Sequence, residues 1–376
     1  MSLRVGLLCH RGVGGSARIA VDLGNALAAR GHTVHLFART RPLGLDRFAA
    51  GVTFHPLVAG DGHAPPSAGL DVDWDRADMA AMADRATDVA SRSGLDVLHF
   101  HYAVPFARIA NEVRHRLRDG GPVVVGTLHG TDVSDCRPSR MPGVTRLLAG
   151  TDALTAVSRS HVRLAARTFG LARMPELIPN FVDVMRFRPL AEEHGPSARP
   201  MRVVHVSNFR PVKDPEAVVR VFLEVRRQVD AELWLVGDGE AMPSVVSAVR
   251  QAGLDRHVRF LGLHPAVESI LPHSDVLLLT SRTESFSLVA LEAAACGVAV
   301  VAPRVGGLPE VVVDGETGLL FEPGRERLAA DAVVRVLSDA RLRSAMRTLA
   351  RRRARRFSSD ALVPRYEALY RRLLAG

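Results

Sequence analysis

Of the 49 lysine and arginine residues in the sequence, only Lys213 is a lysine, so its ammonium group is the first candidate for chemistry. In a chain so rich in arginine, a single lysine indicates a position that needs a compact ammonium group, which a planar guanidinium does not replace. Arg210 stands three residues earlier, and both follow a predicted strand over 202–207. The alternative is that Arg210 and Lys213 are simply two cations in a surface loop, without a ligand. The lone lysine favours a diphosphate site, which suits a guanidinium fork beside a point charge.

Two carboxylates, Glu284 and Glu292, stand eight residues apart in TESFSLVALEAAACG, the first before a predicted helix and the second within it. This spacing is a little over two helical turns, so both side chains are expected on the same side. Carboxylate oxygens accept hydrogen bonds from sugar hydroxyls. The amides of 285–288 can meet a hydroxyl or a phosphate where the helix begins. The spacing alone is weak evidence, but its place between a strand and a helix predicts a sugar-binding loop.

The loop CHRGVGGSAR after the first predicted strand contains Gly12, Gly14 and Gly15 but departs from the dinucleotide pattern G-x-G-x-x-G. The second strand ends LFARTR, without the acidic residue that would bind a nicotinamide dinucleotide ribose. A nicotinamide cofactor is therefore disfavoured. Gly14 and Gly15 can still bring backbone N–H groups close to an anion at a helix start. A tight strand-to-helix turn without a ligand is the alternative.

His129 ends the predicted strand 123–129, where a doubly wound sheet directs side chains into its binding crevice. Tyr102 follows the predicted strand 97–101 in the same way, so its hydroxyl is expected to reach a polar ligand. The alternative for Tyr102 is simple packing against the sheet. Most other histidines, such as His32 and His257, are expected at the surface or at helix caps.

Short apolar runs alternate with longer amphipathic stretches along the chain, which predicts βαβ units and parallel sheets. A polar, proline-containing stretch at 188–200 separates two such series and is the expected linker. Helices are predicted over 17–30 and 359–375. The predicted strands are 4–10, 32–38, 97–101, 123–129 and 153–158 in the first series, and 202–207, 232–238, 258–262, 276–281 and 298–303 in the second.

The composition is that of an ordinary globular protein, with 47% apolar and 24% charged residues, and 376 residues suit two domains. Disordered, collagen-like and disulfide-scaffold classes are excluded, and the three separated cysteines form no zinc motif. No apolar run suits a membrane span and no signal-peptide pattern is present, so a cytoplasmic location is expected. The net charge of +9 raises nucleic acid as a partner, but the basic run 341–356 lacks interleaved aromatic residues. A solvated helix face is expected there, with an anionic membrane surface as the alternative.

Five motifs occur along the chain in a fixed order, namely GVGGS (12–16), HGTD (129–132), VSNFRPVK (206–213), GDGE (237–240) and ESFS…EA (284–293). With these motifs, in the order of the family, the sequence resembles the retaining glycosyltransferases of family 4 over nearly its whole length. The resemblance implies an α/β chain with the GT-B fold, in which two Rossmann-like doubly wound domains face each other across a cleft. It also implies an N-terminal acceptor domain over 1–185, a nucleotide-sugar domain over 186–356, and a C-terminal helix over 357–376 that packs back on the first domain.

The resemblance assigns roles by position. It implies that Arg210 and Lys213 hold the diphosphate, that Glu284 holds the transferred sugar, and that Glu292 holds the nucleotide ribose. It places His129 beside the sugar and its anomeric centre. The implied catalytic residues are His129, Arg210, Lys213 and Glu284. The implied donor-binding residues are Gly15, Asn208, Arg210, Lys213, Gly237, Gly262, Glu284, Ser285, Phe286, Ser287, Leu288 and Glu292. The implied acceptor-binding residues are Gly14, Gly15, Ser16, Tyr102, Thr131 and Asn180.

The implied reaction is front-side sugar transfer with retention, in which the leaving phosphate helps to take the proton of the acceptor. Within the family, the motifs HFHYAVPFA, TLHGTDV, PNFVD and HVSNFR resemble the branch that glycosylates L-malate in bacillithiol synthesis, and more distantly the mycothiol branch. That likeness implies UDP-GlcNAc and L-malate as substrates, with no metal and no cofactor. Asp71 and Asp73 have the D-x-D form of metal-dependent sugar transferases. They lack a second ligand cluster, so metal binding there is not expected.

Three departures from the family leave the acceptor open. Ser287 stands where the family usually has glycine, and 56–75 lacks the expected aromatic, proline-rich stretch. The loop after Asp132 is also altered, although arginines that could hold an acidic acceptor remain, namely Arg137, Arg140 and Arg146. The alternatives are a secondary-metabolite transferase that uses a UDP- or GDP-sugar and a small thiol or aminocyclitol, a transferase with a lipid-linked acceptor, and a non-catalytic nucleotide-sugar-binding protein. The expected partners are a nucleotide sugar and a small polar acceptor, not nucleic acid or a membrane, and a homodimer is left open.

Overall fold

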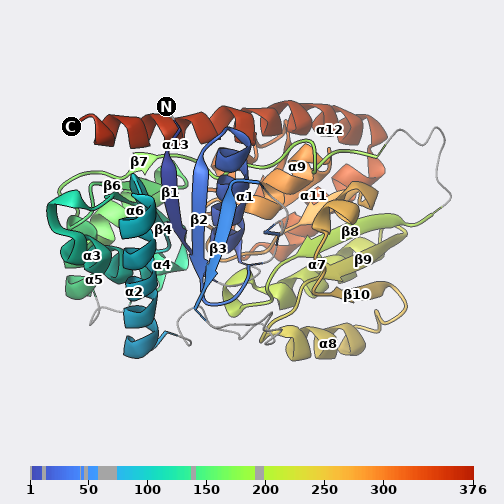
Figure 1. The fold of residues 1–376 in the computed structure, drawn as a ribbon. Coiled ribbons are helices and arrows are strands. Elements are labelled where there is room, and N and C mark those ends of the chain that lie inside the picture. Colours follow the sequence, from blue (N-terminus) through green and yellow to red (C-terminus); the bar gives the residue numbers. More distant parts are fainter. Residues whose placement is uncertain are drawn as a thin grey trace. The chain divides into compact units, whose positions relative to one another are not determined.

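The computed structural model of the chain describes residues 2–10, 14–42, 44–45, 50–57, 74–136, 141–190 and 199–376. The chain divides into two compact units (Figure 1). Unit 1 comprises Met1–Asn180 and Ser359–Gly376, and unit 2 comprises Phe181–Ser358. Val182 belongs with unit 2, because its amide donates to the carbonyl of Phe357 at 2.9 Å. The limits expected from the sequence, 185/186 and 356/357, lie near these two crossings.

Unit 1 contains a seven-stranded sheet in the order β3-β2-β1-β4-β5-β6-β7, with parallel pairing between neighbours. The strand order reverses between β1 and β4, so the carboxyl ends of these two strands form a topological switch point. The strands are β1 (Arg4–Leu8), β2 (Thr33–Ala38), β3 (Val52–Pro56), β4 (Val97–His101), β5 (Val123–Leu128), β6 (Ala153–Ala156) and β7 (Glu176–Leu177).

Capping residues set the limits of several helices in unit 1. The Asp75 carboxylate accepts from the Asp78 amide where α2 begins, and Gly94 ends this helix with a φ of 62°. The Ser158 hydroxyl caps α6 in the same way, and Gly170 ends it. These are the residue types that favour helix ends. The helices are α1 (Gly15–Ala29), α2 (Arg76–Ser93), α3 (Phe106–Leu117), α4 (Thr131–Ser134), α5 (Met141–Ala149), α6 (Arg159–Phe169) and α13 (Ser359–Leu374).

The C-terminal helix α13 is part of unit 1 because it buries polar as well as apolar side chains there. Tyr366 and Tyr370 are fully buried. The buried Glu367 carboxylate accepts from Arg30 at 2.8 and 2.9 Å and contacts the ring of His32 at 2.8 Å. These interactions hold the pKa of Glu367 at about 2, first through Arg30, against the opposing effect of burial. Charged contacts thus join the last helix to the end of α1.

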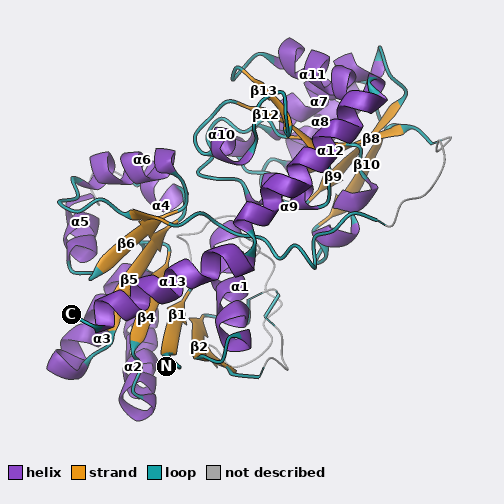
Figure 2. Cartoon of the chain, turned by 90° about the horizontal axis from the view of Figure 1, so that it is seen from above, coloured by secondary structure: helices purple, strands orange, loops and turns teal. Residues whose placement is uncertain are grey.

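Unit 2 contains a six-stranded sheet in the order β10-β9-β8-β11-β12-β13, again with parallel pairing. Figure 2 shows the strands in orange and the helices in purple. The strands are β8 (Met201–Val206), β9 (Ala231–Val236), β10 (Val258–Gly262), β11 (Val276–Leu278), β12 (Ala299–Pro303) and β13 (Gly318–Phe321). The helices are α7 (Pro215–Arg226), α8 (Met242–Gln251), α9 (Leu288–Ala295), α10 (Leu308–Val311), α11 (Glu326–Ser338) and α12 (Ala340–Ala354).

Five short 3₁₀ turns join these elements in the described part of the chain: η1 (Arg118–Gly120), η2 (Pro211–Lys213), η3 (Val267–Ser269), η4 (Leu271–His273) and η5 (Arg355–Phe357). The second of them, η2, lies between β8 and α7 and carries Lys213. None of the helices in the described ranges is long and apolar enough to cross a membrane.

The strands predicted from the sequence are confirmed, with ends that differ by at most three residues. Those strands are largely apolar runs because helices cover parallel sheets on both faces. β3, β7 and β13 were not expected. β3 and β7 are edge strands without such a run, and β7 has only two residues. β13 begins at Gly318, where an added Cβ atom would lie 2.2 Å from the carbonyl oxygen of Val300.

Candidate active site

An ion pair between Lys213 and Glu284 lies at the carboxyl edge of the sheet of unit 2. The Lys213 Nζ atom is 2.6 Å from the Glu284 Oε2 atom. The side chains are 25% and 11% exposed, respectively, so the pair is largely buried yet open to solvent on one side. A charge-assisted hydrogen bond of this length fixes both groups. The structure therefore brings together the candidate diphosphate ligand and the candidate sugar ligand, which are 71 positions apart.

The backbone around Lys213 is held by the strand next to it in the sheet. The Thr280 hydroxyl, just beyond β11, is 3.0 Å from the carbonyl of Lys213 and 2.8 Å from that of Asp214. The Lys213 amide donates to the carbonyl of Arg210 at 2.8 Å and closes the turn η2. The half-buried Arg210 therefore starts the same short turn that ends at Lys213.

The loop that carries Glu284 packs against a second backbone segment so closely that only glycine fits there. The Gly307 amide donates to the carbonyl of Glu284 at 2.8 Å. A Cβ atom on Gly306, whose φ is 51°, would lie 1.8 Å from the same oxygen. Sequence reasoning missed Gly306 and Gly307, although a glycine pair directly after a buried strand is a signal of such an approach.

The predicted donor residues Asn208, Gly237 and Gly262 also lie together in unit 2. The Gly237 amide donates to the carbonyl of Gly262 at 2.7 Å. Gly237 has a φ of 118°, and a Cβ atom there would lie 1.8 Å from the carbonyl oxygen of Ser207, next to the exposed Asn208. Three loops at the carboxyl ends of β8, β9 and β10 thus meet backbone to backbone.

Ser287 lies at the start of α9 in an unusual conformation. Its φ of 80° and ψ of 90° are outside the region that residues with a Cβ atom normally adopt. The residue is only 5% exposed, and its hydroxyl has no hydrogen-bond partner among the described residues. It also gives no side-chain cap to the helix. Ser287 thus combines backbone strain with an unsatisfied buried hydroxyl.

The remaining predicted residues of this loop have different surroundings. Phe286 is buried, and its ring packs against that of Phe357 at 5.8 Å between centroids, so its side chain anchors the loop. Ser285 is half-buried, Leu288 opens α9, and Glu292 is half-buried in the second turn of that helix. The expected loop-then-helix arrangement of Glu284 and Glu292 is therefore present.

We expect Ser287→Gly to be more stable than Ser287→Ala by about 1 kcal/mol, because alanine keeps the strain at positive φ and glycine does not. Both variants remove the unsatisfied hydroxyl, so their difference isolates the backbone conformation. Urea unfolding of the two variants, followed by circular dichroism, measures it. Equal unfolding free energies, or a more stable alanine variant, would contradict the backbone conformation at this position.

In unit 1, the predicted acceptor residues Gly14, Gly15 and Ser16 form the start of α1. Gly14 is the N-cap with extended backbone, and the helix has no side-chain cap and no acidic residue in its first turn. The first amides of a helix have no partner within it, so this end suits an anion or a polar group.

Tyr102 and Thr131 are directly joined in unit 1. The Tyr102 hydroxyl lies 2.8 Å from the Thr131 hydroxyl, and Tyr102 itself is buried. The loops after β4 and β5 therefore meet near the topological switch point. Asn180, which ends the first of the two segments of this unit, is 5% exposed and its Oδ1 atom has no partner among the described residues. It is a second unsatisfied buried polar group among the predicted site residues.

The loop that carries His129 is held by the carboxylate of Asp132. Its oxygens accept from the amides of Ala103, His129 and Gly130 at 2.7 to 3.3 Å. Burial raises the pKa of Asp132 to about 6, although these amide hydrogen bonds act in the opposite direction. Asp132 was quoted within HGTD but not assigned a role. Its spacing of three from His129 is the local signal for such a loop-closing carboxylate.

His129 belongs to a group of buried histidines. Its Nε2 atom lies 3.0 Å from the Nδ1 atom of His101. His99 contacts the Tyr370 hydroxyl and the Thr127 hydroxyl, each at 2.7 Å. The expectation that most other histidines lie at the surface or at caps is wrong for seven of them. Parallel strands covered on both faces bury polar as well as apolar positions. These buried histidines are His10, His32, His35, His99, His101, His161 and His205.

We expect the folded protein to lose stability as the pH falls from about 7 to about 4. Burial lowers the pKa of His99 to about 3 and the pKa values of His161 and His205 to about 4. In the unfolded chain these groups bind protons near pH 6.5. Unfolding therefore takes up protons across this range, which favours the unfolded state at low pH. The raised pKa of Asp132 has the opposite effect, because it stabilises the folded state as the pH falls, but it concerns a single group.

The expected loss is several kcal/mol, because each unit of pKa shift corresponds to about 1.4 kcal/mol. Urea unfolding at a series of pH values measures it. An unfolding free energy that stays level or rises between about pH 7 and about pH 4 would contradict the burial of these neutral rings.

Several predicted features lie outside the described residues, namely Gly12, Asp71, Asp73, Arg137 and Arg140. Arg146 is described and lies exposed on α5. No group of three or more histidine, cysteine or carboxylate side chains in the described ranges is arranged to hold a metal ion.

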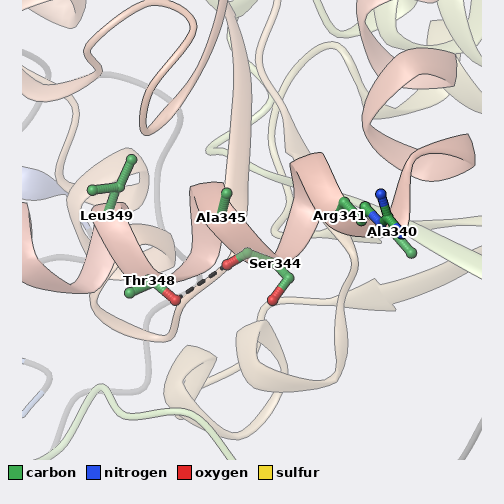
Figure 3. A pocket seen from close by; sticks show the side chains of 6 residues that line it. All are labelled: Ala340, Arg341, Ser344, Ala345, Thr348 and Leu349. Carbon is green, nitrogen blue, oxygen red and sulfur yellow. Dashed lines mark hydrogen bonds between the residues drawn. The ribbon is translucent and has the colours of Figure 1, made fainter.

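The basic run near the C-terminus forms most of α12 and η5, and five of its arginines are exposed, as expected for a solvated face. They are Arg341, Arg351, Arg352, Arg355 and Arg356. A shallow hollow of about 700 Å³ lies on α12. Figure 3 shows the side chains that line it, those of Ala340, Arg341, Ser344, Ala345, Thr348 and Leu349. This hollow has one charged side chain and no group suited to proton transfer. It is therefore not a candidate for the catalytic chemistry.

The chain belongs to the family 4 glycosyltransferases and has their GT-B architecture of two Rossmann-like domains. Residues 13–186 match the family described as Glycosyltransferase Family 4, and residues 188–353 match Glycosyl transferases group 1. The chain is therefore a glycosyltransferase.

Among its relatives, the N-acetyl-alpha-D-glucosaminyl L-malate synthase of Bacillus anthracis is 34% identical over 378 residues, 98% of this chain and 97% of that protein. The D-inositol 3-phosphate glycosyltransferase of Corynebacterium diphtheriae is 29% identical over 392 residues, 95% of this chain and 89% of that protein.

Two solved structures show the same fold. Sucrose-phosphate synthase from Thermosynechococcus elongatus superimposes with a TM-score of 0.82 at 23% identity, over 99% of each chain. Anabaena HepE in complex with UDP and glucose superimposes with a TM-score of 0.80 at 18% identity, over 98% of this chain and 99% of that one. At these identities the likeness concerns the fold alone.

Proposed function

We propose that this glycosyltransferase moves a sugar from a nucleotide-diphosphate donor to a small polar acceptor, with retention of configuration and without a metal ion. The specific pair we propose is UDP-GlcNAc and L-malate. The observation that carries the proposal is the Lys213–Glu284 pair, 2.6 Å apart at the carboxyl edge of the sheet of unit 2. The relative from Bacillus anthracis, whose name contains both the sugar and L-malate, supports the substrates.

In this proposal Lys213 has two tasks. Its ammonium group has three protons, and the carboxylate of Glu284 occupies one. The other two are available to the diphosphate, together with the guanidinium of Arg210 in the same turn. A fixed cation that is already partly desolvated stabilises charge on a leaving phosphate without reorganisation. Glu284, oriented by Lys213, accepts hydrogen bonds from hydroxyls of the transferred sugar, and Glu292 accepts them from the ribose.

The chemical step breaks the bond between the anomeric carbon and the diphosphate oxygen. The acceptor hydroxyl forms the new bond to that carbon from the same face, and its proton passes to the departing phosphate oxygen. His129 lies beside the sugar, and the positive charges of Arg210 and Lys213 stabilise the leaving diphosphate. A divalent metal ion would supply the same charge stabilisation, so two fixed cations make it unnecessary.

The acceptor is proposed to bind in unit 1, near the start of α1 and the Tyr102–Thr131 pair. The first amides of α1, to which the N-cap Gly14 offers no side chain, suit a carboxylate such as those of L-malate. Asn180 presents a buried carbonyl oxygen that lacks a protein partner among the described residues, which suits an acceptor hydroxyl.

We expect Tyr102→Phe and Thr131→Val to raise the KM for the acceptor by roughly 10-fold while sparing donor affinity. Each variant removes one of the two part-buried hydroxyls that hold each other at 2.8 Å beside the proposed acceptor, and a lost hydrogen bond of this kind costs ~1–3 kcal/mol. Steady-state kinetics with each substrate varied in turn separates the two terms. If both variants weaken nucleotide binding and leave the acceptor KM unchanged, the two units have been assigned the wrong way round.

The proposed function is tested in two stages. A thermal-shift screen of UDP, GDP, ADP and dTDP identifies the nucleotide, since a ligand at ~100 times its Kd stabilises the fold by about 2.7 kcal/mol. The protein is then incubated with UDP-GlcNAc and either L-malate or D-inositol 3-phosphate, and products are identified by mass spectrometry. We expect a shift with UDP and a product with L-malate.

Other outcomes of this screen have definite meanings. A product with D-inositol 3-phosphate alone would show that the acceptor is not L-malate. A thermal shift with GDP alone would show that the donor nucleotide is not UDP. A shift without any product, retained in His129→Ala, would favour a non-catalytic nucleotide-sugar-binding protein.

A further inference from the structure

The contact between His101 and His129 bears on which ring nitrogen of His129 carries the proton. The ring planes are inclined by 27° with centroids 5.2 Å apart, and the Nδ1 atom of His101 lies 3.0 Å from the Nε2 atom of His129. Both residues are buried. They follow one another at the carboxyl ends of adjacent strands, since His101 ends β4 and His129 comes directly after β5.

Both rings are neutral near pH 7. Burial, assisted by the neighbouring histidines, lowers the pKa of each ring well below 6.5. A neutral imidazole carries one N–H and one bare nitrogen. A hydrogen bond between two neutral rings therefore requires that one ring donates from the contacting nitrogen and that the other accepts there.

The second nitrogen of His101 decides which ring donates. Its Nε2 atom is fully buried and has no hydrogen-bond partner among the described residues. If His101 accepted at Nδ1, its proton would lie on Nε2 as a buried donor without an acceptor, a rare and costly arrangement. If His101 donates from Nδ1, the orphaned nitrogen is a bare acceptor, for which the penalty is smaller.

The nearby His99 does not offer His101 another partner. Its ring centroid is 4.3 Å from that of His101. Both of its nitrogens are already occupied, Nδ1 by the Tyr370 hydroxyl and Nε2 by the Thr127 hydroxyl. The other histidines close enough to lower the pKa of His129 are His10 and His161. The pKa of His161 is itself lowered to about 4 by burial, so it supplies no positive charge near neutral pH.

We infer that His101 is a positioning residue that fixes His129 in the tautomer with its proton on Nδ1, so that His129 meets the substrate as a hydrogen-bond donor. Because the Nε2 atom of His129 is occupied by His101, Nδ1 is the nitrogen left for a ligand, and no described residue bonds to it. The role toward substrate rests on the proposed function, in which His129 lies beside the transferred sugar. A donor there binds a sugar oxygen and takes no proton, which leaves the leaving phosphate to accept it.

The tautomer is measured directly by long-range ¹H–¹⁵N NMR on protein labelled with ¹⁵N-histidine, with His129→Gln used to assign its signals. We expect the Nδ1–H form for His129 in the wild-type protein at about pH 7. The Nε2–H form would overturn the inference, whatever the activity of the protein. This readout does not depend on the substrates, so failure of the proposed function and failure of the inference are distinguishable.

Two variants test the positioning role. In His101→Asn the side-chain amide keeps an N–H near the position of Nδ1, whereas His101→Leu removes the donor and keeps the bulk. We expect kcat to fall by about 10- to 100-fold in the leucine variant, the scale seen when a partner that orients a functional histidine is lost. The asparagine variant should recover most of that loss, and KM for the donor should change little in either.

The matched control is His35→Leu, which removes another buried histidine from the same sheet, on β2. It should leave the tautomer of His129 and kcat unchanged. Equal loss of kcat in His101→Asn and His101→Leu, at equal thermal stability, would reduce His101 to a packing role and overturn the inference. If His101→Leu does not fold, the tautomer of His129 in the wild-type protein and the kcat of His101→Asn still test the positioning role of His101.

Discussion

Replacing Lys213 by alanine is expected to lower kcat by roughly 10²–10³-fold, the scale for the loss of one preorganised charge donor. The ammonium group lies 2.6 Å from Glu284 and is the one lysine in the sequence. Its removal takes away both a charge for the diphosphate and the partner that orients the carboxylate. Steady-state kinetics, with the nucleotide Kd measured separately, divides the loss between chemistry and donor binding.

The companion variant Lys213→Arg should restore only part of the activity. A guanidinium is planar and wider than an ammonium group, so it cannot take the same position against Glu284. Arg282→Ala is a matched control, because it removes an exposed cation that pairs with Asp214 in the adjoining segment. The control should retain nearly full activity. A fully active Lys213→Arg enzyme would show that the lone lysine has no special place in the chemistry.

The second large effect is expected for Glu284→Gln, with a loss of roughly 10²-fold in kcat/KM. Glutamine keeps the shape but loses the charge, so the buried ammonium of Lys213 is left without its counter-ion. The sugar also loses a charged acceptor for its hydroxyls. Glu216→Gln, a half-exposed carboxylate on α7, is the control for charge removal in this unit.

The double variant Lys213→Ala with Glu284→Gln tests whether the two groups act as a unit. We expect a loss clearly smaller than the product of the two single losses, because residues in direct contact are not additive. Losses that multiply, at unchanged folding, would mean that the ion pair does not couple the two side chains during the reaction.

The two parallel sheets were predictable because most of their strands are largely apolar runs. RVVHV and VLLL are read as buried strands from composition alone, and the structure has them as β8 and β11. The short edge strand β7 has no such run, and its pairing with β6 depends on neighbours that are distant in sequence. Sequence reasoning therefore identifies the central strands and, of the four strands at the sheet edges in the described ranges, only β10.

The individual residues of the candidate site were predictable from the sequence, but their spatial arrangement was not. Lys213 stands out by its rarity, and Glu284 by its spacing from Glu292. Their ion pair follows from the neighbouring places of β8 and β11 in the sheet, although β9 and β10 lie between them in the chain. That crossover depends on tertiary packing, which local patterns do not record.

The buried histidines were missed for a related reason. In VLHFH the two histidines alternate with apolar residues, so His99 and His101 lie on one face of β4. The pattern also suits a half-exposed strand, and the packing of α13 against this sheet places the Tyr370 hydroxyl on His99. A polar pair in a strand that is otherwise apolar was the one available signal.

The measurement that tests the central claim most directly is the anomeric configuration of the product formed in excess EDTA. UDP-GlcNAc and L-malate are incubated with the enzyme under these conditions, and the product is followed by ¹H NMR from the first turnover onward. We expect undiminished turnover and the small H1–H2 coupling of an α-glycoside, as in the donor. A β-product, or activity abolished by EDTA and restored by magnesium or manganese, would contradict it.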